Sequence, residues 1–250
     1  MPEFDFDATF DPEVYLHFYA DGLAERTDRD IDLVSEALSL SGDEHLLDVP
    51  CGHGRVTNRL AEQGHEVTGV DRSAGFLDRA RADARERGVD DRVDYRQGDM
   101  RELPLPDDSV DAAFNVFTSF GYFDDADNRR VLEEAHRVVR PGGRFLVEMV
   151  HQAGVMREFH RTVATHAGPD DRDLLVDENS FDPETGRMHT DRTTYLDGER
   201  RESTYSVRLY TPPELRARFE DAGFEVVGVY GDGTEELTMD AGRVTVVGEV

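Results

Sequence analysis

The sequence predicts an α/β fold built on a doubly wound, mostly parallel sheet, and three observations indicate it. Predicted strands and helices alternate over most of the first 150 residues, as they do where helices join parallel strands. Residues 46–71 combine an apolar strand, a glycine-rich turn, a helix and a second strand. Between residues 151 and 210 the pattern changes to strands separated by hairpin turns. We therefore expect a parallel core with a small antiparallel insertion.

The N-terminal segment is predicted to form helices that lead into the first strand. Residues 4–19 are rich in aromatic side chains. In residues 30–40 the apolar side chains recur at helical spacing, namely Ile31, Leu33, Val34, Ala37 and Leu38. Two further helices are expected at 73–87 and 127–139.

The turn after the first strand has the features of a binding site for an adenosine-containing cofactor. Gly52 and Gly54 follow the strand directly, and a residue without a side chain lets a ligand approach the backbone. The predicted helix at 55–62 then presents the free N–H groups of its first turn. The second strand, 66–70, ends at Asp71, where a carboxylate can accept hydrogen bonds from both ribose hydroxyls.

Two residues near this turn discriminate between cofactors. A dinucleotide-binding turn has a third glycine for close helix packing, and Thr57 stands at that place. Asp48 precedes the turn, where a carboxylate would repel a pyrophosphate but attract an ammonium and a sulfonium group. The pattern favours S-adenosylmethionine, with a plain glycine turn and an NAD-dependent dehydrogenase as the alternatives.

Four segments resemble motifs of the class I S-adenosylmethionine-dependent methyltransferases, in the order that the family has them. They are DVPCGHGR at 48–55, GVDRS at 69–73, QGDM at 97–100 and RPGGR at 140–144. The resemblance extends over residues 43–150. It implies a Rossmann-like, doubly wound sheet of seven mostly parallel strands with helices on both faces.

The resemblance also implies which residues bind the cofactor. In relatives the acid of the third motif contacts the adenine amino group and the next backbone N–H meets the ring, roles that fall to Asp99 and Met100. An N-terminal tyrosine lies over the methionine part of the cofactor, a role open to Tyr15 or Tyr19, with core packing as the alternative. The predicted set comprises Tyr19, Asp48, Pro50, Cys51, Gly52, Gly54, Asp71, Arg72, Ser73, Gly98, Asp99, Met100, Asn115 and Phe117.

The composition indicates the setting in which the protein works. The formal net charge is −27, and all 28 basic residues are arginines. Such a halophile-type surface stays soluble in molar salt, where repulsion is screened over roughly 3 Å at 1 M. The sequence has no long apolar run and no cleavable signal, so we expect a cytoplasmic protein that does not enter a membrane. The single cysteine, Cys51, cannot form an internal disulfide, and we expect no metal site.

The segment after the fourth strand, 110–117, bears on the methyl acceptor. It lacks the Asn-Pro-Pro-Tyr tetrapeptide with which adenine and glutamine methyltransferases hold amides. Its aromatic residues offer an apolar surface that suits a small organic acceptor, although core packing explains at least half of them. The residues predicted to meet the acceptor are Phe120 and Tyr122 of this segment, and His189 and Tyr205 of the insertion.

The chain divides into three predicted parts. Residues 1–150 form cap helices and the cofactor-binding core, 151–210 an insertion of three strands over the substrate, and 211–250 a helix and the last two core strands. The predicted insertion strands are 173–181, 186–196 and 200–210. A solvated lid or a dimer patch is the alternative for this insertion.

These expectations converge on a methyltransferase for a nitrogen or oxygen atom of a small molecule. His151, which follows the fifth strand, is the first candidate for a general base, and a solvated histidine is its alternative. Transfer to tRNA, rRNA or protein, with a small activator subunit, stays open because molar salt weakens the need for a basic surface. A cofactor-binding regulator without catalysis is a further alternative. We expect a monomer or a homodimer.

Overall fold

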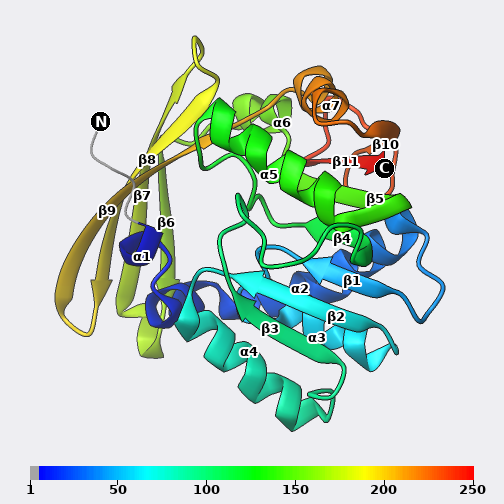
Figure 1. Ribbon diagram of the computed structural model, residues 1–250. Coiled ribbons are helices and arrows are strands. Elements are labelled where there is room, and N and C mark those ends of the chain that lie inside the picture. Colours follow the sequence, from blue (N-terminus) through cyan, green and yellow to red (C-terminus); the bar gives the residue numbers. More distant parts are fainter. Residues whose placement is uncertain (1–5) are drawn as a thin grey trace.

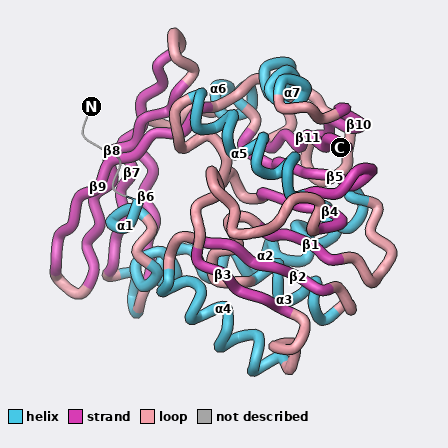
Figure 2. The backbone as a smooth tube through the Cα atoms, viewed as in Figure 1, coloured by secondary structure: helices cyan, strands magenta, loops and turns pink. Residues whose placement is uncertain are grey.

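The computed structural model describes residues 6–250 and contains two β-sheets (Figures 1 and 2). The larger sheet has seven strands in the order β10-β11-β5-β4-β1-β2-β3. β1 to β5 run parallel, and β11 pairs antiparallel with both β5 and β10. The predicted mostly parallel, seven-stranded α/β fold is thereby confirmed. The strands are β1 (His45–Asp48), β2 (Glu66–Asp71), β3 (Val93–Gln97), β4 (Val110–Asn115), β5 (Val139–Val150), β10 (Glu225–Tyr230) and β11 (Arg243–Glu249).

Helices cover both faces of this sheet. One face packs against α2 (Pro12–Leu38), α3 (Arg55–Glu62) and α4 (Ala74–Arg87), with Leu60 and Leu77 in the core. The other packs against α5 (Asp125–Val138) and α7 (Pro212–Asp221), with Leu132 and Phe219 in the core. Both layers are visible in Figure 1. The described residues also form two short helices, α1 (Phe6–Thr9) and α6 (Gln152–Arg157), and a 3₁₀ turn (Pro169–Asp171).

The N-terminal segment forms the short α1 and then one long helix, α2, where the sequence indicated separate apolar stretches. The Asp11 carboxylate caps α2 by accepting hydrogen bonds from the N–H groups of Glu13 and Val14, each 3.0 Å long. The polar middle of α2 stays helical because Leu23 and Thr27 are buried on its inner side. Residues 4 and 5 of the predicted aromatic segment lie outside the described residues.

The insertion is a four-stranded antiparallel sheet, so the prediction of three strands was wrong. Its order is β6 (Thr162–Ala167), β7 (Asp173–Asp182), β8 (Arg187–Leu196) and β9 (Glu199–Arg208). The last three were expected within two residues of their observed ends. β6 escaped prediction because it is an edge strand whose residues are exposed or half-buried, so no buried face imposes alternating apolar residues.

The smaller sheet stands to one side of the core, next to α1 and the beginning of α2 (Figure 1). None of the helices in residues 6–250 combines the length and the apolar character needed to cross a membrane. The division into three parts at residues 150 and 210 stays a prediction.

Candidate active site

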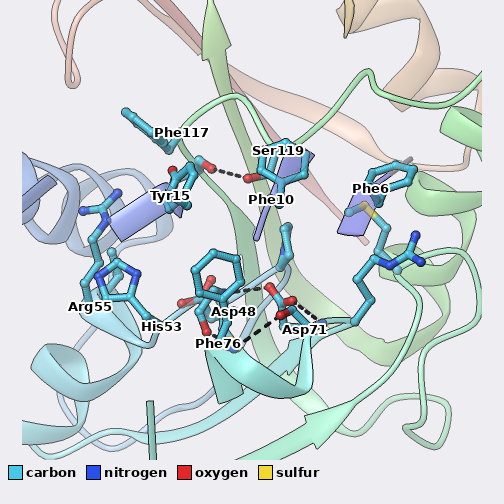
Figure 3. Close-up of a pocket in the computed structure, with 18 of the residues that line it drawn as sticks. Phe6, Phe10, Tyr15, Asp48, His53, Arg55, Asp71, Phe76, Phe117 and Ser119 are labelled. Carbon is cyan, nitrogen blue, oxygen red and sulfur yellow. Dashed lines mark hydrogen bonds between the residues drawn. The ribbon is translucent and has the colours of Figure 1, made fainter. Parts of the chain in front are cut away.

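A cavity lies where β1, β2 and β4 end, beneath α1 and the beginning of α2 (Figure 3). It encloses about 950 Å³ of empty space, part of which is open solvent at its mouth. The carboxyl ends of parallel strands are where such folds bind ligands.

The glycine-rich turn forms the floor of the cavity. Gly52 has φ +54°, and a Cβ added there would meet no protein atom within 4 Å, so this residue faces open space. Gly54 has φ +78°, but a Cβ there would lie 2.3 Å from the Tyr95 hydroxyl and 2.9 Å from Ala80 Cβ. Gly52 therefore leaves room for a ligand, whereas Gly54 lets α3 approach β3 and α4.

Two buried carboxylates border this floor. Asp48 is 2% exposed and accepts a 2.6 Å hydrogen bond from the Thr57 hydroxyl, and burial raises its pKa to about 7. Asp71 accepts hydrogen bonds from the N–H groups of Gly52 (2.9 Å) and Ser73 (2.8 Å), and burial raises its pKa too. Carboxylates that lose water on burial favour a ligand with cationic groups and hydroxyl donors.

The segment after β3 contributes Met100 to the cavity wall. Asp99 is already engaged, because Arg101 donates to both of its oxygens at 3.0 and 2.7 Å and keeps its pKa below the usual value. Gly98 sits against Pro104, and a Cβ there would lie 2.9 Å from the ring. Contact of Asp99 with adenine stays a prediction, and it would have to coexist with the Arg101 ion pair.

Aromatic rings close the cavity from above. Phe10 lies 5.4 Å from Tyr122, and Tyr15 lies 5.5 Å from Phe76, both as ring-centroid distances with edge-to-face geometry. The Arg72 guanidinium lies 4.7 Å from the centroid of Phe6 in α1. Residues of α1, α2 and the segment after β4 thus share one aromatic roof, for which the aromatic-rich N-terminus was the signal in the sequence.

Of the two candidate tyrosines, the structure places Tyr15 at the cavity. Burial raises its pKa to about 12, so it keeps its proton. Tyr19 is not part of the wall: its hydroxyl accepts a 2.9 Å hydrogen bond from Arg192 of the insertion. Arg192 also donates to Tyr205 at 3.3 Å and forms a two-pronged ion pair with Asp177, at 2.7 and 2.8 Å.

Besides Tyr19, eight predicted residues lie outside the cavity wall, namely Gly54, Gly98, Asp99, Asn115, Phe120, His151, His189 and Tyr205. Phe120 is buried in the core against Tyr210, and His189 lies on β8. Asn115 is fully buried, with no partner for either amide atom. His151 is 4% exposed and its Nδ1 lies 3.1 Å from the Ala241 carbonyl oxygen. Their predicted roles in binding and catalysis stay predictions.

The sequence reasoning missed His53 and the side chain of Arg55, which both line the cavity (Figure 3). Burial, helped by Arg55, lowers the pKa of His53 to about 4, so its imidazole is neutral at pH 7. The available signal was their position inside the glycine-rich turn, which presents side chains as well as backbone to a ligand. Pro50, Cys51, Ser73 and Phe117, which belong to the predicted cofactor-binding set, line the same cavity.

This floor of glycine and paired acids fits S-adenosylmethionine, a cofactor with ribose hydroxyls, an ammonium and a sulfonium group. Residues 46–143 match the family model described as a methyltransferase domain. The chain is 31% identical over 201 residues to the ubiquinone/menaquinone biosynthesis C-methyltransferase UbiE of Proteus mirabilis, covering 77% of this chain and 70% of that protein.

Other relatives match less of their length. The chain is 35% identical over 137 residues to methyltransferase GfsG of Streptomyces halstedii, which is 54% of this chain but only 48% of that protein. In three dimensions it superimposes on the CcbJ methyltransferase from Streptomyces caelestis with a TM-score of 0.79, covering 95% and 98% of the two chains at 22% identity. The chain belongs to the class I S-adenosylmethionine-dependent methyltransferases.

Proposed function

We propose that this enzyme methylates a nitrogen or oxygen atom of a small, ring-bearing molecule, with an amine favoured over an alcohol. The observation that carries the proposal is the aromatic roof over the cofactor residues, where Phe10, Tyr15 and Tyr122 converge. A flat or apolar acceptor buries its rings against such a surface, and the tyrosine hydroxyl of Tyr15 orients its polar atoms.

The cofactor supplies an electrophilic methyl group, so the protein mainly positions its two reactants. Asp71 would hold the ribose hydroxyls, and Asp48 would face the ammonium and sulfonium groups. The roof would align the acceptor atom with the sulfur–methyl bond. Alignment of this kind supplies roughly 7–11 kcal/mol of the barrier.

The protonation states of Tyr15 and His53 favour an amine. Tyr15 keeps its proton because burial raises its pKa to about 12, and His53 is a weak base because burial lowers its pKa to about 4. An aliphatic alcohol needs a strong base to become nucleophilic, whereas a neutral amine offers its own lone pair. A neutral phenolic or enolic acceptor would need a weaker base than an aliphatic alcohol but, unlike a neutral amine, would still need one.

The test uses S-adenosylmethionine carrying a ¹³C-labelled methyl group, incubated in high salt with the small-molecule fraction of a cell extract. The labelled product is isolated, and the chemical shifts of its methyl group identify the acceptor atom. A methylated nitrogen or oxygen supports the proposal. A methylated carbon, the outcome that the name of the UbiE relatives suggests, overturns it, as does label found only in RNA or protein.

The matched control is Asp71→Asn, which keeps the shape of the side chain but removes the charge that would bind the ribose. Label transfer should fall with this variant in step with its cofactor affinity. Transfer that persists unchanged would show that the product does not come from this cavity.

A further inference from the structure

A cluster of buried charged side chains lies beside the cavity, and it has no part in the methyl transfer proposed for this enzyme. Asp30 of α2 and Glu148 of β5 are 1% and 2% exposed. Arg26 donates to both Asp30 oxygens at 2.7–3.1 Å and reaches Glu148 at 3.3 Å. Arg55 pairs with Asp30 at 2.5 Å, and Arg243 of β11 pairs with Glu148. Three guanidinium groups thus share two carboxylates.

Phe117 connects this cluster with the cavity. Its ring lines the cavity, and the guanidinium carbons of Arg26, Arg55 and Arg243 lie 4.6, 5.6 and 5.7 Å from the ring centroid. Its backbone N–H donates to Glu148 Oε2 over 2.7 Å. The carboxylate that binds two of the arginines therefore also holds the backbone of a cavity residue.

The backbone at this point is strained. Phe117 has φ +62° and Thr118 has φ +58°, so two consecutive residues with side chains adopt the left-handed conformation, one of them β-branched. Two further hydrogen bonds to β5 hold the turn: Thr118 N–H to the Glu148 carbonyl at 3.1 Å, and Val150 N–H to the Thr118 hydroxyl at 3.0 Å. A strained backbone conformation persists only where several surrounding contacts stabilise it, and such conformations are frequent at ligand-binding sites.

We propose that Glu148 is a positioning residue for the cofactor: it holds the Phe117–Thr118 turn in the left-handed conformation and so fixes the Phe117 ring as the cavity wall. Figure 3 shows Phe117, Tyr15 and Arg55 on one side of the cavity, Phe6 on the opposite side, and Asp71 between them beside Asp48. With Asp71 in its predicted role at the ribose, Phe117 forms the wall at the methionine end. The inference concerns cofactor binding and stands independently of the acceptor.

The test measures the dissociation constants of S-adenosylmethionine and S-adenosylhomocysteine by calorimetry in high salt, together with the thermal midpoint of the free protein. Thr118→Gly leaves every ion pair intact but lets the turn sample other conformations. Because ligand binding must then order the turn again, the dissociation constants of both ligands should rise about tenfold. Thr118→Asn tolerates the left-handed conformation and offers an acceptor oxygen, so it should restore tight binding relative to Thr118→Gly.

The matched control is Asp197→Gly, at a left-handed residue in the turn between β8 and β9, away from the cavity. It makes the same kind of backbone change and should leave both dissociation constants unchanged. Glu148→Gln keeps an acceptor for the Phe117 N–H but removes the charge that binds two arginines. It should weaken both ligands at least as much as Thr118→Gly.

Thr118→Gly decides the matter if Glu148→Gln does not fold. Dissociation constants for Thr118→Gly within about twofold of the wild type would overturn the proposal, because the turn would then be only a consequence of packing. Equal weakening by Thr118→Asn and Thr118→Gly would overturn it too, since the threonine side chain and not the turn would then matter.

Discussion

Replacing Asp48 with asparagine should stabilise the free protein, by an amount that depends on pH. Burial at the end of β1 raises the pKa of Asp48 from 3.8 to about 7, against the opposing effects of the Thr57 hydroxyl and Arg55. The folded protein therefore holds this proton more tightly than the unfolded chain does. The resulting stability is fully present below about pH 4 and is lost as the pH rises to about 7.

The magnitude follows from the two pKa values. A difference of one pKa unit between the folded and unfolded states changes the free energy of unfolding by about 1.4 kcal/mol. The rise from 3.8 to about 7 therefore changes it by about 4 kcal/mol as an upper limit. Asparagine cannot ionise and its amide oxygen can still accept from Thr57. The Asp48→Asn variant should match the wild type near pH 4 and exceed it progressively up to about pH 7.

Urea unfolding of both proteins at a series of pH values, in the same salt, measures this difference. Other carboxylates with perturbed pKa values, such as Asp30 and Glu44, are common to both proteins and cancel. A stability difference that stays constant between about pH 4 and pH 7 would refute the reasoning. In the same series, S-adenosylmethionine should bind the wild type more tightly as the pH rises through about 7, and should bind Asp48→Asn weakly at every pH.

Three further outcomes are expected. Because the formal net charge is −27, the thermal midpoint should be markedly lower in about 0.1 M than in about 1 M KCl, and equal midpoints in calorimetry would exclude salt adaptation. Arg187 donates to the carbonyl groups of residues 121–123 at 3.0–3.3 Å, so Arg187→Met should speed amide hydrogen exchange around Tyr122 about tenfold without changing cofactor affinity. Exchange at the wild-type rate would show that the Arg187 hydrogen bonds do not stabilise this segment of the cavity wall. His151→Ala should lower turnover and leave the cofactor dissociation constant alone; unchanged turnover would exclude His151 as a base.

The parts of the fold with local signals could be predicted closely. The helix at 55–62 coincides with α3, and the second strand ends at Asp71 as expected. The reason is that the glycine turn, the helix start and the apolar strand each impose their own residue types over a few positions. The same holds for the hairpins of the insertion, whose turns at 182–186 and 197–199 contain Gly and Asp.

Features that depend on tertiary packing could not be predicted in this way. Tyr15 and Tyr19 lie four residues apart on one face of α2, and only the position of the insertion decides that Tyr19 meets Arg192. The sequence could have revealed Glu148, because a glutamate inside the apolar run of β5 is unusual for a strand buried on both faces. Its partners Arg26 and Arg243 are too distant in the chain for any local pattern to join them.

The exclusive use of arginine has a second cause besides the predicted salt adaptation, and the structure supplies it. Arg192 binds Asp177 through two nitrogens and also donates to two tyrosine hydroxyls, and Arg187 donates to three successive backbone carbonyl groups. A lysine ammonium is a single point donor that cannot serve such planar, branched sets of acceptors. Both residues join the insertion to the core beside the cavity. At these positions the guanidinium is therefore required by geometry, whereas at exposed positions such as Arg172 only the composition of the surface favours it.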